Sequence, residues 1–376
     1  MSFEKNIRVL HILSSPSAGG AEVYVKDLIS NLKVKGQNVA LLFISTSEEV
    51  NRSPEYQKSF IEYLGNEDIP FYFLKSGGRR NLIIGAKSFK RAIQYFKPDI
   101  IHSHLLSGVI YSFLYARKIP LVYTHHNTVI DTNEVLFRML MNACKGFIGI
   151  SEVCTNYLKS YLPKEKPLKT IYNSVDQNRL ILKDYKKQKN DFDVVEVLAV
   201  GRLQEQKNYP LLLDAINIVN EKTKYRFKVS IAGEGYPEIK QLIKNKIKEF
   251  NLSEVVYLLG NRTDIPKLMH DSDIFIMSSA WEGLPIALIE AQITGLPAIV
   301  TDVGGCKEVI ERTKGGQVVE PDKPDALASA LIQLIEDKKT RESQGESSQS
   351  NIEVFDINYS AQEHLEFYHF ILSSNN

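Results

Sequence analysis

Long apolar stretches are missing from this chain, because its 376 residues contain no run of 18 apolar residues free of charge. The sequence therefore predicts no membrane-spanning helix. Cysteine is scarce and odd in number, and Cys144, Cys154 and Cys306 show no metal-binding spacing, as expected for a protein of the reducing cytosol. Residues 1–6 lack the apolar core of a secretory leader, so we expect a cytoplasmic protein.

An excess of charge of one sign is also missing. Lysine and arginine number 46 and aspartate and glutamate 45, for a net charge of +1, so the overall charge gives no basis for nucleic-acid binding. The chain is 43% hydrophobic and 24% charged, which is typical of a globular protein. Its length exceeds that of one ordinary domain and allows two with full cores.

Short apolar runs alternate with segments of helical period along nearly the whole chain. This alternation predicts an α/β fold of parallel sheets wrapped by helices. The expected strands are residues 7–13, 38–45, 70–74, 99–103, 121–124, 146–150, 168–172, 194–200, 227–232, 255–259, 273–277, 298–300 and 317–319.

A polar segment, residues 176–193, is the expected linker between two doubly wound domains. We predict the first domain at residues 1–178 and the second at 190–352, facing each other across a cleft with ligand at the carboxyl ends of the strands. Residues 338–351 are polar and are expected to be weakly structured. Residues 359–372 are expected to form a final helix.

The segment from Glu282 to Glu290 is the most informative part of the sequence. A buried strand runs into a small turn that opens a helix through Gly283 and Pro285, and such a helix start binds anions. The two carboxylates would lie about 12 Å apart along the axis if the segment were fully helical. That separation suits a ligand with hydroxyl groups at both ends and phosphates between them, such as a nucleotide sugar.

Two basic residues, Arg202 and Lys207, follow the first strand of the second domain. A guanidinium and an ammonium form charge-assisted hydrogen bonds that strengthen as a departing diphosphate gains charge. The alternative is an ordinary solvated loop. Gly19 and Gly20 follow the first strand of the chain and let the backbone approach a ligand closely, although two glycines also suit a simple turn.

Several blocks, taken in order, resemble the family-4 glycosyltransferases, which are retaining enzymes of the GT-B fold, here of the bacterial polysaccharide-biosynthesis type. The departures are Ser174, where the family usually has glycine, and Leu284, where phenylalanine is common; both affect details of the donor pocket. The blocks are Gly19-Gly20-Ala21-Glu22, Thr124-His125-His126-Asn127, Ile171-Tyr172-Asn173-Ser174-Val175-Asp176, Val200-Gly201-Arg202-Leu203-Gln204-Glu205-Gln206-Lys207-Asn208, Ala232-Gly233-Glu234-Gly235 and the Glu282/Glu290 pair.

The resemblance implies a GT-B fold of two Rossmann-like domains, with the helix at 357–373 packing back on the first. It implies a nucleotide-sugar donor, with UDP favoured and GDP left open, and Glu290 as the ribose ligand. The implied catalytic residues are His126, Arg202, Lys207 and Glu282. The implied donor-binding residues are Gly19, Gly20, Gly201, Gly233, Leu259, Gly260, Gly283, Leu284 and Glu290, and His104 and His125 are assigned to the acceptor side.

Two apparent metal motifs are not expected to bind metal. Asp271-Ser272-Asp273 precedes a strand, where a helix-terminal turn is expected. For His102 and His104 we expect side chains on opposite faces of a strand, too far apart to share an ion. We therefore expect no metal and no other cofactor.

The implied activity is a hexosyltransferase reaction. It moves a hexose or N-acetylhexosamine to a hydroxyl of a glycan or lipid-linked acceptor in cell-surface polysaccharide biosynthesis. The alternatives are another enzyme on the same fold, such as a UDP-sugar epimerase or a phosphorylase, and a non-catalytic glycan-binding subunit. The presence of both basic residues and both carboxylates disfavours the binding subunit.

Residues 75–97 contain seven basic residues and no acidic one, with apolar residues at helical spacing. One interpretation is a basic amphipathic helix on the anionic inner face of the plasma membrane. The other is an ordinary helix that packs on the sheet with its basic residues in water. Both interpretations remain open from sequence alone.

Overall fold

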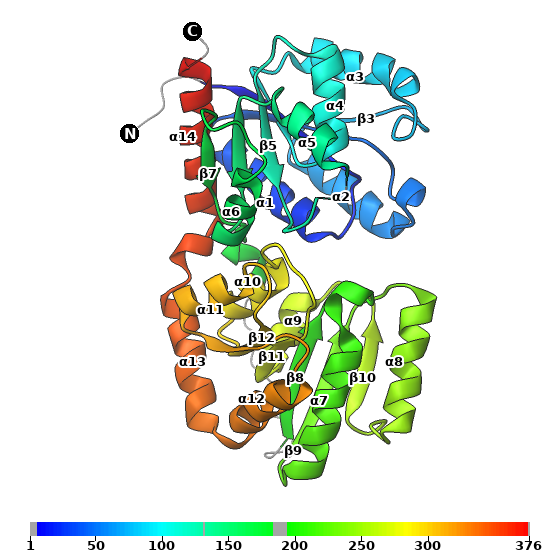
Figure 1. Cartoon of the computed structure of the whole chain (residues 1–376), viewed down its shortest axis with the longest axis vertical. Coiled ribbons are helices and arrows are strands. Elements are labelled where there is room, and N and C mark those ends of the chain that lie inside the picture. The colour runs from blue at the N-terminus through cyan, green and yellow to red at the C-terminus, as the bar shows by residue number, and fades with distance from the viewer. Residues whose placement is uncertain (1–5, 131, 183–193, 375–376) are drawn as a thin grey trace. The chain divides into compact units, whose positions relative to one another are not determined.

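The computed structural model describes residues 6–130, 132–182 and 194–374. The chain divides into two compact units. Unit 1 comprises Met1–Asn173 and Ile357–Asn376, and unit 2 comprises Ser174–Asp356. Part of the expected linker, residues 183–193, lies outside the described residues. Each unit is an α/β sandwich with helices on both faces of a parallel sheet (Figure 1).

Unit 1 contains a seven-stranded parallel sheet in the order β3-β2-β1-β4-β5-β6-β7. The order reverses between β1 and β4, which is the topological switch point of a doubly wound sheet. Its strands are β1 (Arg8–Leu13), β2 (Asn38–Phe43), β3 (Phe71–Phe73), β4 (Ile100–Ser103), β5 (Leu121–His125), β6 (Gly146–Gly149) and β7 (Leu168–Thr170).

The helices of unit 1 cover that sheet because each presents one apolar stripe to it. Side-chain caps begin several of them: Asn81 accepts from the backbone N–H groups of Ile83 and Ile84 at the start of α3. The helices are α1 (Gly20–Val34), α2 (Pro54–Asn66), α3 (Leu82–Phe96), α4 (Leu106–Tyr115), α5 (Glu134–Met141) and α6 (Glu152–Lys159), with a 3₁₀ turn η1 (Glu48–Val50).

The last helix, α14 (Ile357–Ser373), belongs to unit 1 although all of unit 2 precedes it in the chain. The Tyr24 hydroxyl on α1 lies 2.8 Å from the Ser360 hydroxyl on α14. The Tyr368 hydroxyl lies 2.6 Å from Nδ1 of His102 on β4. These buried polar contacts fix the register of α14 against the sheet, since a shifted helix would leave polar atoms unpaired.

Unit 2 contains a six-stranded parallel sheet in the order β10-β9-β8-β11-β12-β13. Its strands are β8 (Val194–Val200), β9 (Arg226–Ala232), β10 (Val256–Gly260), β11 (Ile274–Met277), β12 (Ala298–Thr301) and β13 (Gly316–Val319). Its helices are α7 (Tyr209–Lys222), α8 (Pro237–Glu249), α9 (Ile265–Asp271), α10 (Ile286–Ile293), α11 (Cys306–Thr313), α12 (Pro324–Glu336) and α13 (Lys338–Ser350), with 3₁₀ turns η2 (Gln177–Leu180), η3 (Glu205–Lys207) and η4 (Glu353–Phe355).

The strands predicted from the sequence are confirmed in both units, and so is the doubly wound α/β architecture. That two sheet faces meet across a cleft remains a prediction. No helix in the described part of the chain is long and apolar enough to cross a membrane.

The prediction that residues 338–351 are weakly structured is wrong, because α13 occupies them. Asp337 caps this helix by accepting the backbone N–H of Thr340 at 2.9 Å. Ser348 is buried and its hydroxyl donates to the carbonyl of Gln292 on α10 at 3.0 Å. Tertiary packing therefore stabilises a serine-rich helix whose own propensity is low.

The packing of α14 against the sheet can be tested at Gly146 on β6. A Cβ at this position would lie 2.6 Å from Cδ1 of Ile371 and 2.8 Å from Cζ of Phe367. Both side chains are buried, so we expect Gly146→Ala to lower the free energy of unfolding by about 1–3 kcal/mol, measured by urea denaturation. The matched control is Gly65→Ala on α2, where an added Cβ meets nothing within 4 Å and is expected to stabilise slightly. Equal stability of the two variants would contradict a tightly packed α14.

Candidate active site

Three glycine-containing loops meet at the carboxyl end of the unit 2 sheet. Gly201, Gly233 and Gly260 follow or end the neighbouring strands β8, β9 and β10. Gly233 has a φ of +153°, and a Cβ there would lie 1.9 Å from the carbonyl oxygen of Gly201. Only glycine fits such an approach. Three of the four sequence-predicted donor-binding glycines of unit 2 are thus brought together, and the fourth, Gly283, lies in the loop after Glu282.

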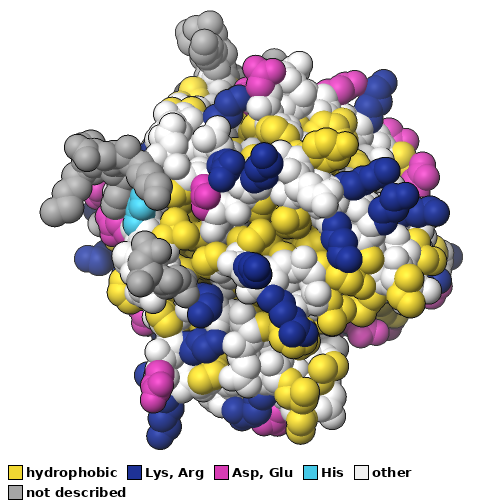
Figure 2. Space-filling view, turned by 90° about the horizontal axis from the view of Figure 1, so that it is seen from above, with side chains coloured by type: hydrophobic (Ala, Val, Ile, Leu, Met, Phe, Trp, Pro, Cys, Tyr) yellow, Lys and Arg dark blue, Asp and Glu magenta, His cyan; other side chains and the backbone are white. Residues whose placement is uncertain are grey.

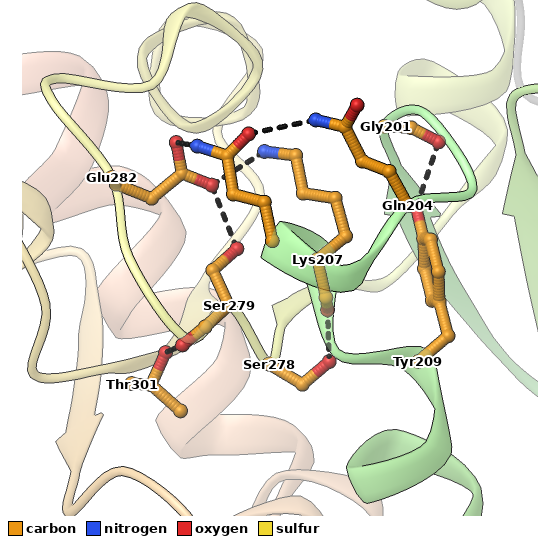
Figure 3. Close-up of polar contacts among 9 residues, drawn as sticks. Gly201, Gln204, Lys207, Tyr209, Ser278, Ser279, Glu282 and Thr301 are labelled. Atoms are coloured by element: carbon orange, nitrogen blue, oxygen red, sulfur yellow. Dashed lines mark hydrogen bonds and ion pairs between the residues drawn. The ribbon is translucent and has the colours of Figure 1, made fainter. Parts of the chain in front are cut away.

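A buried ion pair lies beside these loops (Figure 3). Nζ of Lys207, at the end of η3, donates to Oε1 of Glu282 at 2.6 Å. The side chains are 14% and 7% exposed, respectively. The hydroxyl of Ser279 donates to the same oxygen at 2.7 Å, and the amide of Gln206 donates to Oε2 at 3.3 Å. The Glu282 carboxylate is thus held by three side chains, so its position is fixed before any ligand arrives.

The backbone around this ion pair is fixed by buried hydroxyl groups. Ser278, just past β11, donates to the carbonyl of Lys207 at 2.9 Å, and Thr301 on β12 donates to the carbonyl of Ser279 at 2.7 Å. The Tyr209 hydroxyl donates to the carbonyl of Gly201 at 2.9 Å, and burial raises the pKa of Tyr209. Tyr209 therefore stays protonated and can serve as this donor (Figure 3).

The helix after Glu282 begins later than the sequence predicts. Pro285 is the N-cap of α10, so residues 282–285 form a loop, and the 12 Å helical separation of the two carboxylates does not apply. This loop is held by the chain after β12: the N–H of Gly305 donates to the carbonyl of Gly283 at 2.6 Å. Gly304 has a φ of +53°, and a Cβ there would lie 2.2 Å from the carbonyl of Glu282.

Glu290 is buried on α10, and its partner was not predicted from the sequence. Nη2 of Arg179, in η2, donates to Oε1 of Glu290 at 2.5 Å. The Arg179 side chain is 28% exposed and that of Glu290 is 9% exposed. No periodic pattern in the sequence marks Arg179. The signal that could have identified it is its position, three residues after the block that ends at Asp176.

The remaining donor-side candidates of unit 2 differ in burial. Arg202 and Leu259 are half-buried, and Leu284 is buried at 3% exposure. A hollow of about 530 Å³ lies beside the Glu282 loop. Neither Leu259 nor Gly260 lines this hollow. Its lining residues are Gln204, Glu205, Gln206, Tyr236, Glu238, Ile239 and Trp281.

In unit 1 the predicted residues also lie at the carboxyl end of the sheet. Gly19 is the N-cap of α1, and Gly20 is its first residue. His125 ends β5 with its Nδ1 3.2 Å from the Tyr123 hydroxyl, and its ring stacks on Tyr157 with ring centroids 6.0 Å apart.

Four histidines of unit 1 form a cluster, and one prediction about them is wrong. They are His11, His102, His104 and His126. The prediction that His102 and His104 point to opposite faces is wrong. Their ring centroids lie only 4.2 Å apart, which shows that the two side chains point the same way. In a strand, successive residues point to opposite faces, whereas residues two apart lie on the same face. His102 in β4 and His104 just after its end keep this same-face spacing. His104 contacts His126 on one side, with Nδ1 to Nε2 at 2.9 Å, and His11 on the other, with Nε2 to Nδ1 at 3.1 Å.

This cluster includes the one group among the described residues with the spacing of a metal site. One ligand atom from each of His11, His102 and His104 lies within 4.8 Å of the other two. Both ring nitrogens of His102 are already engaged, by the hydroxyls of Tyr368 and Thr124 at 2.6 Å each. A metal would have to displace one of these bonds, so the contacts fit a hydrogen-bonded cluster better. The expected absence of a metal remains a prediction.

Burial keeps these imidazoles neutral. It lowers the pKa of His126 to about 3 and that of His125 to about 4. It also lowers the pKa of His104 well below the usual value, with neighbouring histidines adding to the effect. Neutral rings can donate through one nitrogen and accept through the other.

The motif Asp271-Ser272-Asp273 lies at the amino end of β11, as expected, away from the residues above. Asp271 pairs with Lys267 at 2.9 Å, and Oδ2 of Asp273 accepts the N–H of Glu196 at 2.9 Å. Both carboxylates therefore have structural partners.

Comparison with known proteins identifies this arrangement. The family described as Glycosyltransferase Family 4 matches residues 18–179, and Glycosyl transferases group 1 matches residues 182–351. The chain is 26% identical to the capsular polysaccharide biosynthesis glycosyltransferase CapH of Staphylococcus aureus, over 96% of this chain and 98% of that protein. It is 32% identical to the UDP-Gal:alpha-D-GlcNAc-diphosphoundecaprenol alpha-1,3-galactosyltransferase of Escherichia coli, over 67% and 70%. The structure of Anabaena HepE in complex with UDP-glucose matches with a TM-score of 0.79 at 21% identity, over 96% and 100%.

Two doubly wound parallel units, with basic and acidic side chains at the carboxyl end of the second, are the architecture of the GT-B glycosyltransferases. The chain belongs to glycosyltransferase family 4. It is therefore an enzyme that transfers glycosyl groups.

The strength of the Lys207–Glu282 pair can be measured with a double-mutant cycle. We expect Lys207→Met and Glu282→Gln to show a coupling of about 1–3 kcal/mol in the free energy of unfolding, because both groups are largely desolvated. Trp281 is the chain's single tryptophan, so its fluorescence during urea denaturation reports on unit 2.

The control cycle uses Lys338→Met and Glu342→Gln. That pair is 3.6 Å apart on α13 with side chains 77% and 63% exposed, and its expected coupling is about 0.3–0.5 kcal/mol. A Lys207–Glu282 coupling no larger than the control value would show that the pair does not organise the site.

Proposed function

We propose that this enzyme transfers a hexose or N-acetylhexosamine from a UDP-sugar, with retention of anomeric configuration, to a hydroxyl of a growing glycan. The observation that carries the proposal is the meeting of Lys207 and Glu282 beside the glycine loops of unit 2. A diphosphate needs cations and backbone close by, and a sugar needs a fixed hydrogen-bond acceptor. Retention rests on the family resemblance.

The choice of UDP is supported by relatives. The E. coli relative is named as a user of UDP-Gal, and the HepE structures contain UDP or UDP-glucose. The proposed ribose ligand is Glu290, whose carboxylate is buried and held by Arg179. On binding, ribose hydroxyls would share that carboxylate with Arg179, since one carboxylate has about four acceptor sites.

The proposed chemistry depends on charge at the leaving group. The bond between the anomeric carbon and the diphosphate oxygen breaks, and that oxygen gains negative charge. Arg202 and Lys207 stabilise this charge, which makes a divalent cation unnecessary in this proposal. The acceptor hydroxyl forms the new glycosidic bond, and its proton passes to an oxygen of the departing diphosphate.

The proposed role of unit 1 is contact with the transferred sugar and the acceptor, through His126 and the loop at Gly19 and Gly20. The polysaccharide setting is supported by CapH and by the amylovoran biosynthesis glycosyltransferase AmsD, to which the chain is 30% identical over 76% of its length. A lipid-linked acceptor is supported by the name of the E. coli relative, which specifies a diphosphoundecaprenol substrate.

A lipid-linked acceptor makes contact with a membrane surface useful, and we propose that α3 provides it. Ile83 and Tyr95 on α3 are 83% and 76% exposed, whereas Phe89 is buried and stacks on Tyr111. Part of the apolar stripe thus packs on the core and part faces outward. All seven basic residues of segment 75–97 are exposed. Figure 2 shows lysine and arginine side chains interspersed with hydrophobic ones on one face of the molecule.

The activity is tested by nucleotide release across UDP-, GDP- and ADP-sugars, with and without lipid-linked acceptors. We expect release of UDP that requires both a UDP-sugar and an acceptor. Lys207→Ala should lower the rate at least about a hundredfold, the scale for removing one preorganised charge stabiliser. The control is Lys246→Ala, which removes a lysine paired with Asp214 on the helices of the same unit and should leave transfer unchanged.

The rival activities give different results in the same assay. An epimerase would convert the nucleotide sugar without acceptor-dependent release. A glycan-binding subunit would gain no thermal stability from saturating UDP, because a ligand stabilises a protein only by binding its native state. Normal turnover by Lys207→Ala would remove the proposed diphosphate contact.

Membrane contact is tested with vesicles of phosphatidylcholine, with and without phosphatidylglycerol. We expect binding only to the anionic vesicles, and the triple variant Lys87→Gln, Lys90→Gln, Arg91→Gln should weaken it by about 3 kcal/mol, since each charge near the surface contributes about 1 kcal/mol. The control triple variant, Lys222→Gln, Lys244→Gln, Lys248→Gln, changes exposed residues of unit 2. Equal binding by both triple variants would contradict a specific role for α3.

A further inference from the structure

Three imidazoles of unit 1 form a continuous hydrogen-bonded chain. Nδ1 of His11 lies 3.1 Å from Nε2 of His104, and Nδ1 of His104 lies 2.9 Å from Nε2 of His126. Both distances are those of N–H···N hydrogen bonds. The chain therefore joins three rings through four of their six nitrogens.

The hydrogen-bonded chain of imidazoles runs from the interior of unit 1 toward the carboxyl end of its sheet. His11 lies within β1, whereas His104 follows β4 and His126 follows β5, and these three strands are neighbours in the sheet. Ring centroids are 5.4 Å and 5.2 Å apart, close to the spacing of about 4.7–4.9 Å between strands. Exposure rises along the chain: His11 is 0% exposed, His104 is 8% exposed and His126 is half-buried.

Both ends of the chain are unsatisfied. Nε2 of His11 and Nδ1 of His126 are buried and have no hydrogen-bond partner within the part of the chain that the structure describes. Three neutral imidazoles carry three N–H protons, and the two internal hydrogen bonds use two of them. The third proton must sit at one end of the chain, on His11 or on His126.

Two arrangements of the same protons follow. In the first, His11 donates to His104, His104 donates to His126, and Nδ1 of His126 carries the remaining N–H. In the second, every bond is reversed, so Nδ1 of His126 is a bare acceptor and Nε2 of His11 carries the N–H. Each arrangement leaves one buried donor and one buried acceptor without partners, so the contacts of the chain alone favour neither.

We propose that His104 is a positioning residue that, together with His11, sets the tautomer of His126. Nδ1 of His126 is buried, so a ligand reaches it only by uncovering it. A ligand that then accepts a hydrogen bond from this nitrogen selects the first arrangement, and one that donates to it selects the second. His126 thereby adapts to a sugar hydroxyl or an acceptor oxygen without changing its charge. This inference rests on the proposed function for the contact between His126 and the sugar.

The surroundings support a neutral chain. Burial lowers the pKa of His11 to about 3, in keeping with the lowered values of the other two rings. No carboxylate is hydrogen-bonded to any of the three imidazoles in the contacts of the described residues, so none is held as a cation. The neighbour His364 is equally buried and contacts His102 with ring centroids 5.7 Å apart. Its Nδ1 pairs with the Ser360 carbonyl at 2.8 Å, outside the chain.

The test is a nitrogen-15 NMR measurement of the ring nitrogens in full-length protein labelled only at its eight histidines. A protonated and a bare ring nitrogen have distinct signals, so the spectrum reports the tautomer of His126. We expect His11→Phe to change the tautomer populations of His126, two rings away. The control His364→Phe removes an equally buried imidazole outside the chain and should leave them unchanged.

Two variants of His104 sharpen the test. In His104→Asn, the side-chain amide can bond His126 but is too short to reach His11. In His104→Gln, the longer side-chain amide reaches toward His11. We expect the effect of His11→Phe on His126 to vanish in the His104→Asn background. His104→Gln should lower transfer by roughly tenfold or more, the scale for losing an orienting partner, and by more than His104→Asn does.

The inference is overturned if His126 gives the same signals in wild type and His11→Phe, or if the effect of His11→Phe persists undiminished in His104→Asn. It is also overturned if added Zn²⁺ alone shifts the signals of His11, His102 and His104 together, which would assign the cluster to a metal. The spectra need no turnover. If the tautomers are coupled but no donor supports sugar transfer, the proposed function is contradicted and the coupling between His11 and His126 is not.

Discussion

The charge of Glu282 is the constraint on which the site of unit 2 depends. Its side chain is 7% exposed, and a buried charge persists only where partners replace its water. Lys207 and Gln206 supply partners from the turn after β8, and Ser279 supplies one from the turn after β11. Because β8 and β11 are neighbours in the sheet, one carboxylate ties together loops more than seventy residues apart in sequence.

The parts that the sequence predicts well are those in which one local pattern dominates. A strand buried on both faces is a nearly continuous apolar run, as in residues 274–277, and such runs locate the strands of both sheets. Parallel order then brings all carboxyl ends to the same side of a sheet. For this reason Lys207 and Glu282, each placed just after a strand, could be expected to meet.

The parts that the sequence does not predict depend on partners distant in the chain. Arg179 stands in a polar stretch and pairs with Glu290, 111 residues away, and no local pattern marks it. His104 contacts His11 and His126, which come from β1 and from the turn after β5, so this cluster depends on strand order and not on a local pattern. Helix α13 forms because Ser348 bonds to the backbone of α10, which outweighs its weak intrinsic propensity.

The place of α14 in unit 1 has a consequence for how the protein is made. Unit 2 is one continuous stretch of chain and can fold as soon as it leaves the ribosome, whereas unit 1 waits for residues 357–373, which follow it. Until then the surface of unit 1 against which Phe367, Tyr368 and Ile371 later pack is uncovered. We expect the nascent first unit to be the form most open to chaperone binding and aggregation, since exposed apolar surface drives both.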